Sequence, residues 1–166
     1  MNLTSDVLDT PVGALVLVYE GDALVHVDFA DNEARRDAQL RKRYRAFTLG
    51  PRKKAHPVLR AFRRYFEGDA NALEALDVEL SPGGTPTQQK VWRALRRIPV
   101  GKTMSYGALA TKLGMPGAAR AVGRINGQNP LGVIVPCHRV VGANGALTGY
   151  AAGVERKEWL LALEAR

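Results

Sequence analysis

One short segment, Ser81-Pro82-Gly83-Gly84, interrupts every hydrophobic pattern in this 166-residue chain. Proline lacks a backbone donor and glycine is conformationally unrestrained, so neither a helix nor a strand is expected to continue through it. The chain on each side is long enough to enclose a small hydrophobic core. The sequence therefore predicts two domains, residues 1–80 and 87–166, joined by a linker at 81–86.

The two halves differ in charge. Residues 1–80 carry 12 Lys and Arg against 13 Asp and Glu, whereas residues 81–166 carry 12 against 3. The positive excess of the second half indicates that this half meets a polyanion such as nucleic acid. A basic surface without a partner is the alternative that charge alone leaves open. The basic run Arg41–Arg45 lies in the first half and is interpreted as a solvated helix end.

The first half has the pattern of a small α/β domain. Gly13–Glu20 and Ala23–Phe29 are rich in β-branched residues and are separated by the turn signal Gly21-Asp22, which predicts a hairpin. Alternation in the second run predicts a half-buried strand, with His26 in a structural or exposed position rather than as a ligand. The other predicted elements are a helix over Glu33–Phe47 capped by Asp31, a helix from Pro57 to Gly68, and an edge strand at Leu76–Leu80.

The second half has the pattern of a helix-turn-helix. Thr85-Pro86-Thr87-Gln88 is a capping-box helix start. Ser105 is expected to cap a short helix that ends at Gly114, and Pro116 to open a second one. Any helical hairpin has a similar pattern, so the pattern alone does not decide between DNA binding and simple packing.

The only cysteine, Cys137, follows the apolar run Val133–Val135, which predicts a short buried strand stopped by Pro136. A lone cysteine is usually a small hydrophobe, so the residue alone is weak evidence for a reactive thiol. One cysteine excludes an internal disulfide and suits a reducing compartment. The sequence has no membrane-length apolar run and no signal-type start, so we expect a cytoplasmic protein.

The segment NPLGVIVPCHRVVG, preceded by SYGALA and AARAVG and followed by GYAAGVERKEWLLALE, extends the pattern well beyond Cys137. Over about Thr85–Glu164 the sequence resembles the O6-alkylguanine-DNA alkyltransferases, with these segments in the same order. The resemblance implies an α+β protein, with a small N-terminal α/β domain containing an antiparallel sheet and a mostly helical, winged-helix-like domain with a helix-turn-helix. It implies single-turnover DNA repair, in which Cys137 irreversibly takes the alkyl group of O6-alkylguanine, with O4-alkylthymine as a further candidate lesion.

The resemblance also implies catalytic roles. Cys137 is the expected nucleophile, and it must become a thiolate to break an alkyl–oxygen bond at neutral pH. His138 is implied to reach the thiol through a water and to be oriented by Glu164, which can support an imidazolium. Tyr106 is implied to help rotate the nucleotide and to hydrogen-bond guanine N3, and Asn129 to brace the turn before the active site.

A base inside a duplex must be flipped out before it can enter a pocket. By resemblance, Arg120 enters the stack in place of the flipped nucleotide. Arg124 lies one helical turn further on and is expected to contact phosphate. Small residues around Arg120 are expected to allow close approach to DNA. The DNA-binding residues implied in this way are Ser105, Tyr106, Ala119, Arg120 and Arg124.

The segment Leu147–Gly153 is implied to form the wall of the substrate pocket. Tyr150 is expected to stack on the guanine, while the carbonyls of Cys137 and Val140 and the amide of Ala151 are expected to bind the base edge. Ala151 replaces a serine of some family members, which backbone recognition should tolerate. Ala152 stands where glycine is common, and its methyl is expected to narrow the access of bulky adducts.

We expect no cofactor. We also expect no metal, because the zinc site of some family members uses cysteines and none precedes Cys137. The expected partner is duplex DNA containing O6-alkylguanine, bound by a protein that is monomeric in solution; cooperative binding is left open. Three alternatives compete with repair: a non-catalytic lesion-binding protein of the same fold, a cysteine hydrolase, and a helix-turn-helix regulator. The presence of Cys137 argues against the first of these.

Overall fold

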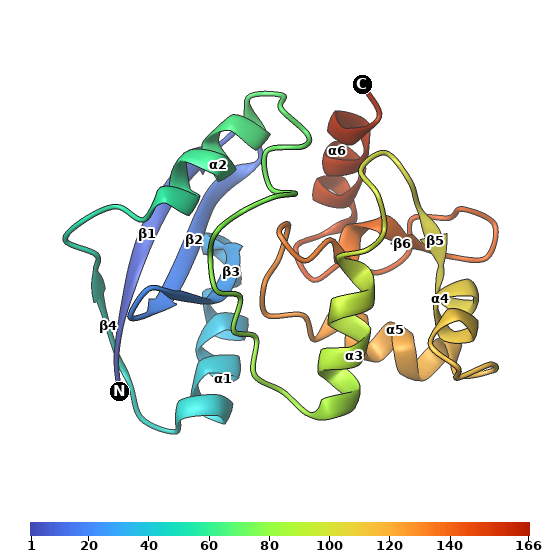
Figure 1. Cartoon of the computed structure of the whole chain (residues 1–166), viewed down its shortest axis with the longest axis horizontal. Helices are drawn as coiled ribbons and strands as arrows, with labels where there is room; N and C mark the ends of the chain where they lie inside the picture. The colour runs from blue at the N-terminus through green and yellow to red at the C-terminus, as the bar shows by residue number, and fades with distance from the viewer. The chain divides into compact units, whose positions relative to one another are not determined.

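The computed structural model describes residues 1–166, which divide into two compact units, Met1–Gly83 and Gly84–Arg166 (Figure 1). None of the helices has the length and apolar character needed to cross a membrane. Unit 1 contains β1 (Asn2–Thr10), β2 (Gly13–Glu20), β3 (Ala23–Phe29), the 3₁₀ turn η1 (Ala30–Asn32), α1 (Glu33–Tyr44), β4 (Thr48–Pro51) and α2 (Pro57–Phe66). Unit 2 contains α3 (Pro86–Leu95), β5 (Met104–Ser105), α4 (Tyr106–Lys112), α5 (Ala119–Gly127), the 3₁₀ turn η2 (Cys137–Arg139), β6 (Val140–Val141) and α6 (Val154–Glu164).

Unit 1 is built on a four-stranded sheet of order β3-β2-β1-β4. The predicted hairpin of β2 and β3 is confirmed, and β1 pairs antiparallel with β2. We expected an antiparallel sheet, but β4 lies parallel to β1, so the sheet is mixed. The sequence did not predict β1 or β4. In β1 only Leu3 and Leu8 are buried, and their five-residue spacing does not produce a strand-like alternation.

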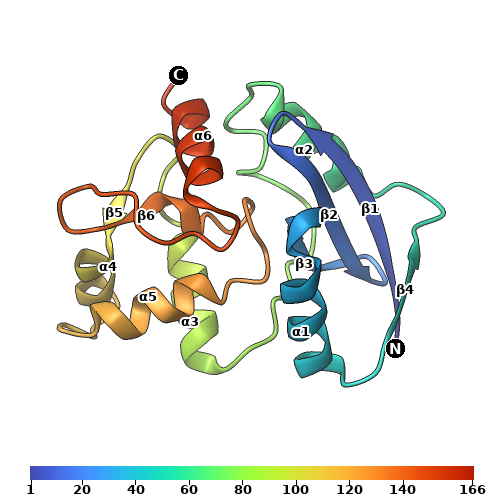
Figure 2. The same cartoon turned by 180° about the vertical axis from the view of Figure 1, so that it is seen from behind.

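Helices cover both faces of this sheet (Figures 1 and 2). Leu40 of α1 packs on Leu3, Val16, Val18 and Val25, together with Tyr44, Phe47 and Leu49. On the other face, His56 at the start of α2 stacks on Tyr19, with ring centroids 5.2 Å apart. Because both faces are covered, β3 is buried along almost its whole length, and the predicted half-buried strand is wrong.

Three local predictions in unit 1 also need correction. Asp31 does not cap the first helix; it lies within η1, and α1 begins after Asn32. α1 ends at Tyr44, before the predicted Phe47, because Arg45 takes a positive φ of 64°. The segment Leu76–Leu80 forms no strand and makes only an isolated bridge from Leu80 to β3. The predicted helix from Pro57 is confirmed as α2.

Unit 2 is mostly helical. The capping box is confirmed, since Thr85 Oγ1 accepts from Gln88 N at 3.1 Å and Gln88 Oε1 accepts from Thr85 N at 2.9 Å. Ser105 Oγ caps α4 by accepting from Ala108 N at 3.0 Å. α5 begins at Ala119 rather than Pro116, because Gly117 has a left-handed φ of 82°. α4 and α5 pack together as a helical pair, and α6 is the last helix of the unit. A sheet-containing unit 1 and a mostly helical unit 2 confirm the predicted α+β class.

Candidate active site

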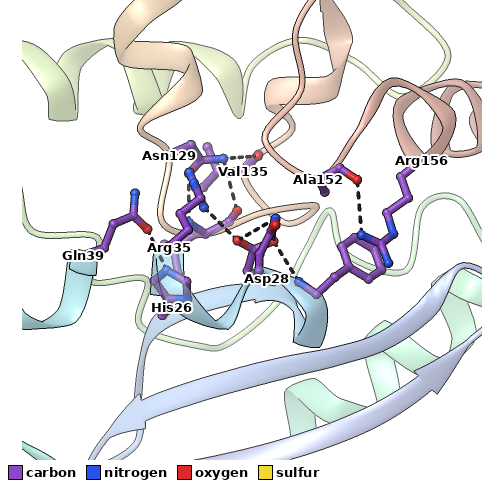
Figure 3. A network of polar contacts seen from close by, with 11 residues as sticks. His26, Asp28, Arg35, Gln39, Asn129, Val135, Ala152 and Arg156 are labelled. Atoms are coloured by element: carbon purple, nitrogen blue, oxygen red, sulfur yellow. Dashed lines mark hydrogen bonds and ion pairs between the residues drawn. The ribbon is translucent and has the colours of Figure 1, made fainter. Parts of the chain in front are cut away.

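The chain approaches Cys137 through overlapping turns, not through the predicted strand at Val133–Val135. Val133 has a φ of 69°, and Ile134 N donates to Gly132 O at 2.8 Å. The buried side chain of Asn129 stabilises these turns. Its Oδ1 accepts from Leu131 N at 2.9 Å and its Nδ2 donates to Val135 O at 2.9 Å (Figure 3). Asn129 thus satisfies backbone groups that a strand would have paired with a neighbour.

Cys137 begins the short turn η2 and is 7% exposed. Its N–H donates to Val135 O at 2.8 Å, and its carbonyl accepts from Val140 N. The backbone here is 3₁₀ rather than extended, so Cys137 and His138 do not point to opposite sides as strand neighbours do. The only thiol of the chain is therefore held by a rigid turn in a nearly buried position.

A buried group of three side chains lies directly after Cys137. His138 Nε2 lies 2.7 Å from Glu164 Oε2, and Arg139 Nε donates to Glu164 Oε1 at 2.8 Å. Arg139 also donates from Nη1 to Ile98 O at 2.7 Å. Glu164 of α6 therefore accepts from two neighbouring residues of η2. This contact joins the last helix to the turn that holds the thiol.

The protonation of His138 follows from its surroundings. Burial lowers the pKa of His138 below its ordinary value, while the hydrogen bond and charge of Glu164 oppose this shift. A neutral His138 that donates from Nε2 to the carboxylate has a lone pair on Nδ1. That Nδ1 is buried and has no hydrogen-bond partner within the chain. His138 is thus arranged to accept a proton on Nδ1 beside a carboxylate that would stabilise the resulting charge.

Lys157 of α6 is a fully buried lysine to which the sequence analysis assigned no role. Its Nζ donates to Val140 O at 2.6 Å and to Thr148 O at 3.0 Å. Burial lowers the pKa of Lys157, and interaction with Cys137 opposes that shift. The signal that could have revealed it is helical spacing. Lys157 shares one face of α6 with the buried Leu160 and Glu164, where a lysine is not expected unless it has partners.

Tyr106, the first residue of α4, connects the helical pair to the loop before α6. Its hydroxyl donates to Thr148 O at 3.4 Å, and its ring centroid is 5.9 Å from Lys157 Nζ. A Cβ at Gly123 of α5 would lie 3.4 Å from this ring, so α5 passes close to it. Burial raises the pKa of Tyr106, and Cys137 adds to the shift. Tyr106 therefore remains a hydroxyl donor at neutral pH.

The loop at residues 147–153 lies near the same group. The ring of Tyr150 is 6.5 Å from that of His138, at an interplanar angle of 78°. Ala151 is exposed and Ala152 is partly buried. Arg156 Nη1 donates to the carbonyl of Ala152 at 3.2 Å (Figure 3). α6 thus holds both ends of this loop, through Lys157 and Arg156.

The remaining predicted residues lie on the helical pair. Arg120 and Arg124 are exposed and four residues apart, so they share one side of α5. Ala119 is partly buried at the start of the same helix, and the hydroxyl of Ser105 is used in capping α4. No group of three or more His, Cys, Asp or Glu side chains could hold a metal ion.

Residues 86–166 match the family model of the 6-O-methylguanine DNA methyltransferase DNA-binding domain. A methylated-DNA–protein-cysteine methyltransferase of Mycolicibacterium paratuberculosis is 43% identical over 159 residues, which cover 96% of this chain and 90% of that protein. The chain belongs to the methylated-DNA–protein-cysteine methyltransferase family. The corresponding protein of Salmonella typhimurium is 61% identical over 97 residues, and that match covers about half of each protein, 58% of this chain and 56% of the relative.

Solved structures of the family agree with the fold. The crystal structure of the Mycobacterium tuberculosis O6-methylguanine methyltransferase has a TM-score of 0.80 and 41% sequence identity, covering 98% of this chain and 93% of that one. A Mycobacterium tuberculosis OGT structure in complex with DNA has a TM-score of 0.81 at 42% identity, covering 99% and 93%. The family expected from the Pro-Cys-His-Arg motif and its flanking segments is thereby confirmed.

Proposed function

We propose that this methyltransferase-family chain repairs alkylated DNA by transferring the alkyl group of O6-alkylguanine to Cys137. The observation that carries the proposal is the nearly buried thiol of Cys137, followed by a histidine whose Nε2 lies 2.7 Å from the carboxylate of Glu164. Relatives that align with nearly the whole chain are named methylated-DNA–protein-cysteine methyltransferases. Membership of that family supports the same reaction class here.

The chemistry requires a thiolate. The Cys137 proton passes through a water to His138 Nδ1, and Glu164 stabilises the imidazolium that forms. The sulfur attacks the alkyl carbon, a C–S bond forms, and the C–O bond breaks with its electron pair left on the guanine. Water does not cleave the resulting thioether, so each molecule reacts once. The buried ammonium of Lys157 favours the thiolate through its positive charge.

Recognition of the base is assigned to the loop that α6 holds. Tyr150 lies beside His138 and offers a flat face for stacking. Tyr106, a neutral hydroxyl donor, is assigned to hydrogen-bond guanine N3 and so to stabilise the departing base. The carbonyl of Val140 and the amide of Ala151 are assigned to the base edge. Because the side chains of Ala151 and Ala152 are small, the main chain contributes most of the recognition in this loop.

DNA binding is assigned to the helical pair. Arg120 and Arg124 project from one side of α5 in the strongly basic half of the chain. Arg120 fills the place of the flipped nucleotide, and Arg124 contacts phosphate. The solved Mycobacterium tuberculosis relative in complex with DNA supports DNA as the partner, and we propose that it is a duplex. O4-alkylthymine is a second candidate lesion, and the chain is proposed to act as a monomer in the cytoplasm.

The test is the intact mass of the chain after incubation with a duplex containing O6-methylguanine. We expect a gain of one CH₂ on Cys137. Cys137→Ser should bind the duplex with similar affinity but gain no mass. Binding by the wild-type chain without any mass gain would overturn the proposal and favour the non-catalytic lesion-binding protein. A mass gain at another residue would exclude Cys137 as the acceptor.

A further inference from the structure

Asn126 lies on the inner side of α5, away from the exposed Arg120 and Arg124, and only 4% of it is exposed. Its Nδ2 donates to the carbonyl oxygen of Cys137 at 3.3 Å. The same carbonyl accepts the backbone N–H of Val140. Two donors therefore meet the carbonyl of Cys137, one from Val140 of β6 and one from α5. Asn126 thus links α5 to the nucleophile's own residue.

This hydrogen bond fixes the orientation of the Asn126 amide. If the amide were turned over, Oδ1 would face the Cys137 carbonyl and two acceptors would meet. Oδ1 is therefore the amide atom that does not face the Cys137 carbonyl. It is buried and has no hydrogen-bond partner in the chain. A buried acceptor without a donor is unfavourable, so such an atom in a folded protein needs a donor that the protein chain itself does not supply.

A second acceptor of the same kind belongs to His138. Its Nε2 is taken by Glu164, and its Nδ1 is also buried without a partner in the chain. Asn126 is hydrogen-bonded to the carbonyl of Cys137, and His138 is the next residue in the sequence, so two residues joined to Cys137 each offer one buried acceptor. A buried water has two hydrogens to donate and normally makes two to four hydrogen bonds.

We propose that Asn126 is a positioning residue for deprotonation of Cys137. Its Oδ1 and His138 Nδ1 accept the two hydrogens of one water, which leaves a lone pair of the water oxygen for the Cys137 S–H. The inference rests on the proposed function, because this is the water through which His138 takes the thiol proton. Without Asn126 the water has one anchor and can turn its lone pair away from the thiol.

The proton balance of the step is simple. The S–H bond breaks with its electron pair left on sulfur, and the proton joins the water oxygen. The water releases to His138 Nδ1 the hydrogen that it had donated there, while the hydrogen bonded to Asn126 stays in place. The products are a thiolate, an imidazolium and one water. Asn126 is neither protonated nor consumed, and its contribution is orientation alone.

The test uses the fact that Cys137 is the only cysteine. Alkylation by iodoacetamide therefore reports on this thiol alone, whether or not the chain repairs DNA. The rate of alkylation against pH gives the apparent thiol pKa. We expect Asn126→Leu, of similar size but without polar atoms, to lower the rate at neutral pH about 10-fold and to raise the midpoint by about one pH unit. Asn126→Asp should raise the midpoint further, because it adds a negative charge beside the thiol.

Ile125→Val is the matched control, because Ile125 is the buried neighbour of Asn126 on α5. It removes one methylene from the same helix and should leave the midpoint unchanged. An unchanged midpoint in Asn126→Leu would overturn the inference and leave Asn126 a packing residue, whatever shift the added charge of Asn126→Asp produces. Methyl transfer from O6-methylguanine duplex to the wild-type chain is measured separately. Its failure would overturn the proposed function, whereas intact transfer without midpoint shifts would overturn only the role of Asn126.

Discussion

Each unit contains a histidine that is at most 1% exposed, and these two histidines differ in the partner of their Nε2. His26 of β3 and His138 of η2 are both almost fully buried, and each has an Nδ1 without a hydrogen-bond partner in the chain. His26 Nε2 lies 2.7 Å from the amide oxygen of Gln39 (Figure 3), and His138 Nε2 lies 2.7 Å from the carboxylate of Glu164. The neighbour of His26 is neutral, whereas that of His138 is an acid.

This one difference separates a structural histidine from a candidate base. Burial lowers the pKa of His26 to about 4, and the amide of Gln39 opposes the shift only through its hydrogen bond. The charge of Asp28 opposes the shift as well, but Asp28 makes no hydrogen bond to His26 and pairs with Arg35 at 2.8 Å (Figure 3). At His138 burial also lowers the pKa, but Glu164 opposes it through both a hydrogen bond and a charge. A buried imidazole accepts a proton usefully only where a charge compensates it.

The largest effect is expected from Glu164→Gln, which gives His138 the kind of partner that His26 has. The single-turnover rate with saturating O6-methylguanine duplex should fall at least about 100-fold, because the imidazolium loses its stabilising charge. The free energy of unfolding should fall by about 3 kcal/mol, because the buried guanidinium of Arg139 loses the carboxylate of Glu164. Rapid-quench kinetics and urea denaturation measure the two effects.

Glu158→Gln is the control for this substitution, since Glu158 is exposed on the same helix. It removes the same charge from α6 without touching His138, and it should leave the rate and the unfolding free energy nearly unchanged. An undiminished rate in Glu164→Gln would mean that the two histidines do not differ in function as their partners suggest.

An intermediate effect is expected on the pH dependence of the free energy of unfolding, to which His26 contributes. His26 is neutral when folded, with a pKa of about 4, whereas in the unfolded chain it titrates near 6.5. The unfolded state binds more protons between these values, so stability falls as the pH is lowered through this window. The loss from His26 should approach about 3 kcal/mol. His26→Gln should flatten this dependence.

Equilibrium urea unfolding between pH 4.5 and 7 measures the effect. Both tryptophans, Trp92 and Trp159, lie in unit 2, so their fluorescence follows that unit, while far-ultraviolet circular dichroism also follows the sheet of unit 1. Equal pH slopes in the wild type and in His26→Gln would show that His26 does not carry the dependence.

The smallest effect is expected from Gln39→Glu, which gives His26 a carboxylate as its partner. The pKa of His26 should rise from about 4 by one to two units, because an adjacent negative charge favours the imidazolium. NMR titration of the imidazole C–H signals measures it. The rate of alkyl transfer should not change. Ala38→Glu adds the same charge at an exposed position of α1 and should leave the His26 signal unmoved.

Local signals predicted much of this fold. The turn at Gly21-Asp22 and the caps at Thr85 and Ser105 act over a few residues, and the structure contains each element that they predict. β4 depends on pairing with β1, which lies far away in the sequence, and β1 forms a hairpin with β2 but has no strand-like alternation of its own. Pairing with a distant strand is a tertiary effect that single-sequence patterns do not record.

The residues of the candidate site also divide into those that the sequence indicated and those that it missed. The Pro-Cys-His-Arg motif and the segments around it indicated Cys137, His138 and Glu164 through family resemblance, and the structure places the last two in contact. The strand predicted from the apolar run before Cys137 is wrong, because the side chain of Asn129 satisfies backbone groups that a neighbouring strand would otherwise satisfy. Helical spacing could have indicated that Lys157 is buried, but the partners of Lys157 and Asn126 are backbone carbonyls, which no sequence pattern displays.

Lys157 also bears on how fast the pocket loop can move. Lifting the loop from α6 would separate a buried ammonium from the carbonyls of Thr148 and Gly149, which it contacts at 3.0 and 3.5 Å. Charged donors are not released into an apolar interior, so the loop opens only when water enters or the first turn of α6 unwinds. The amide protons of the loop should therefore exchange with solvent at rates close to those of α6. In the proposed repair reaction, α6 therefore holds this loop in place before any base arrives, and little ordering of the loop is left for binding to complete.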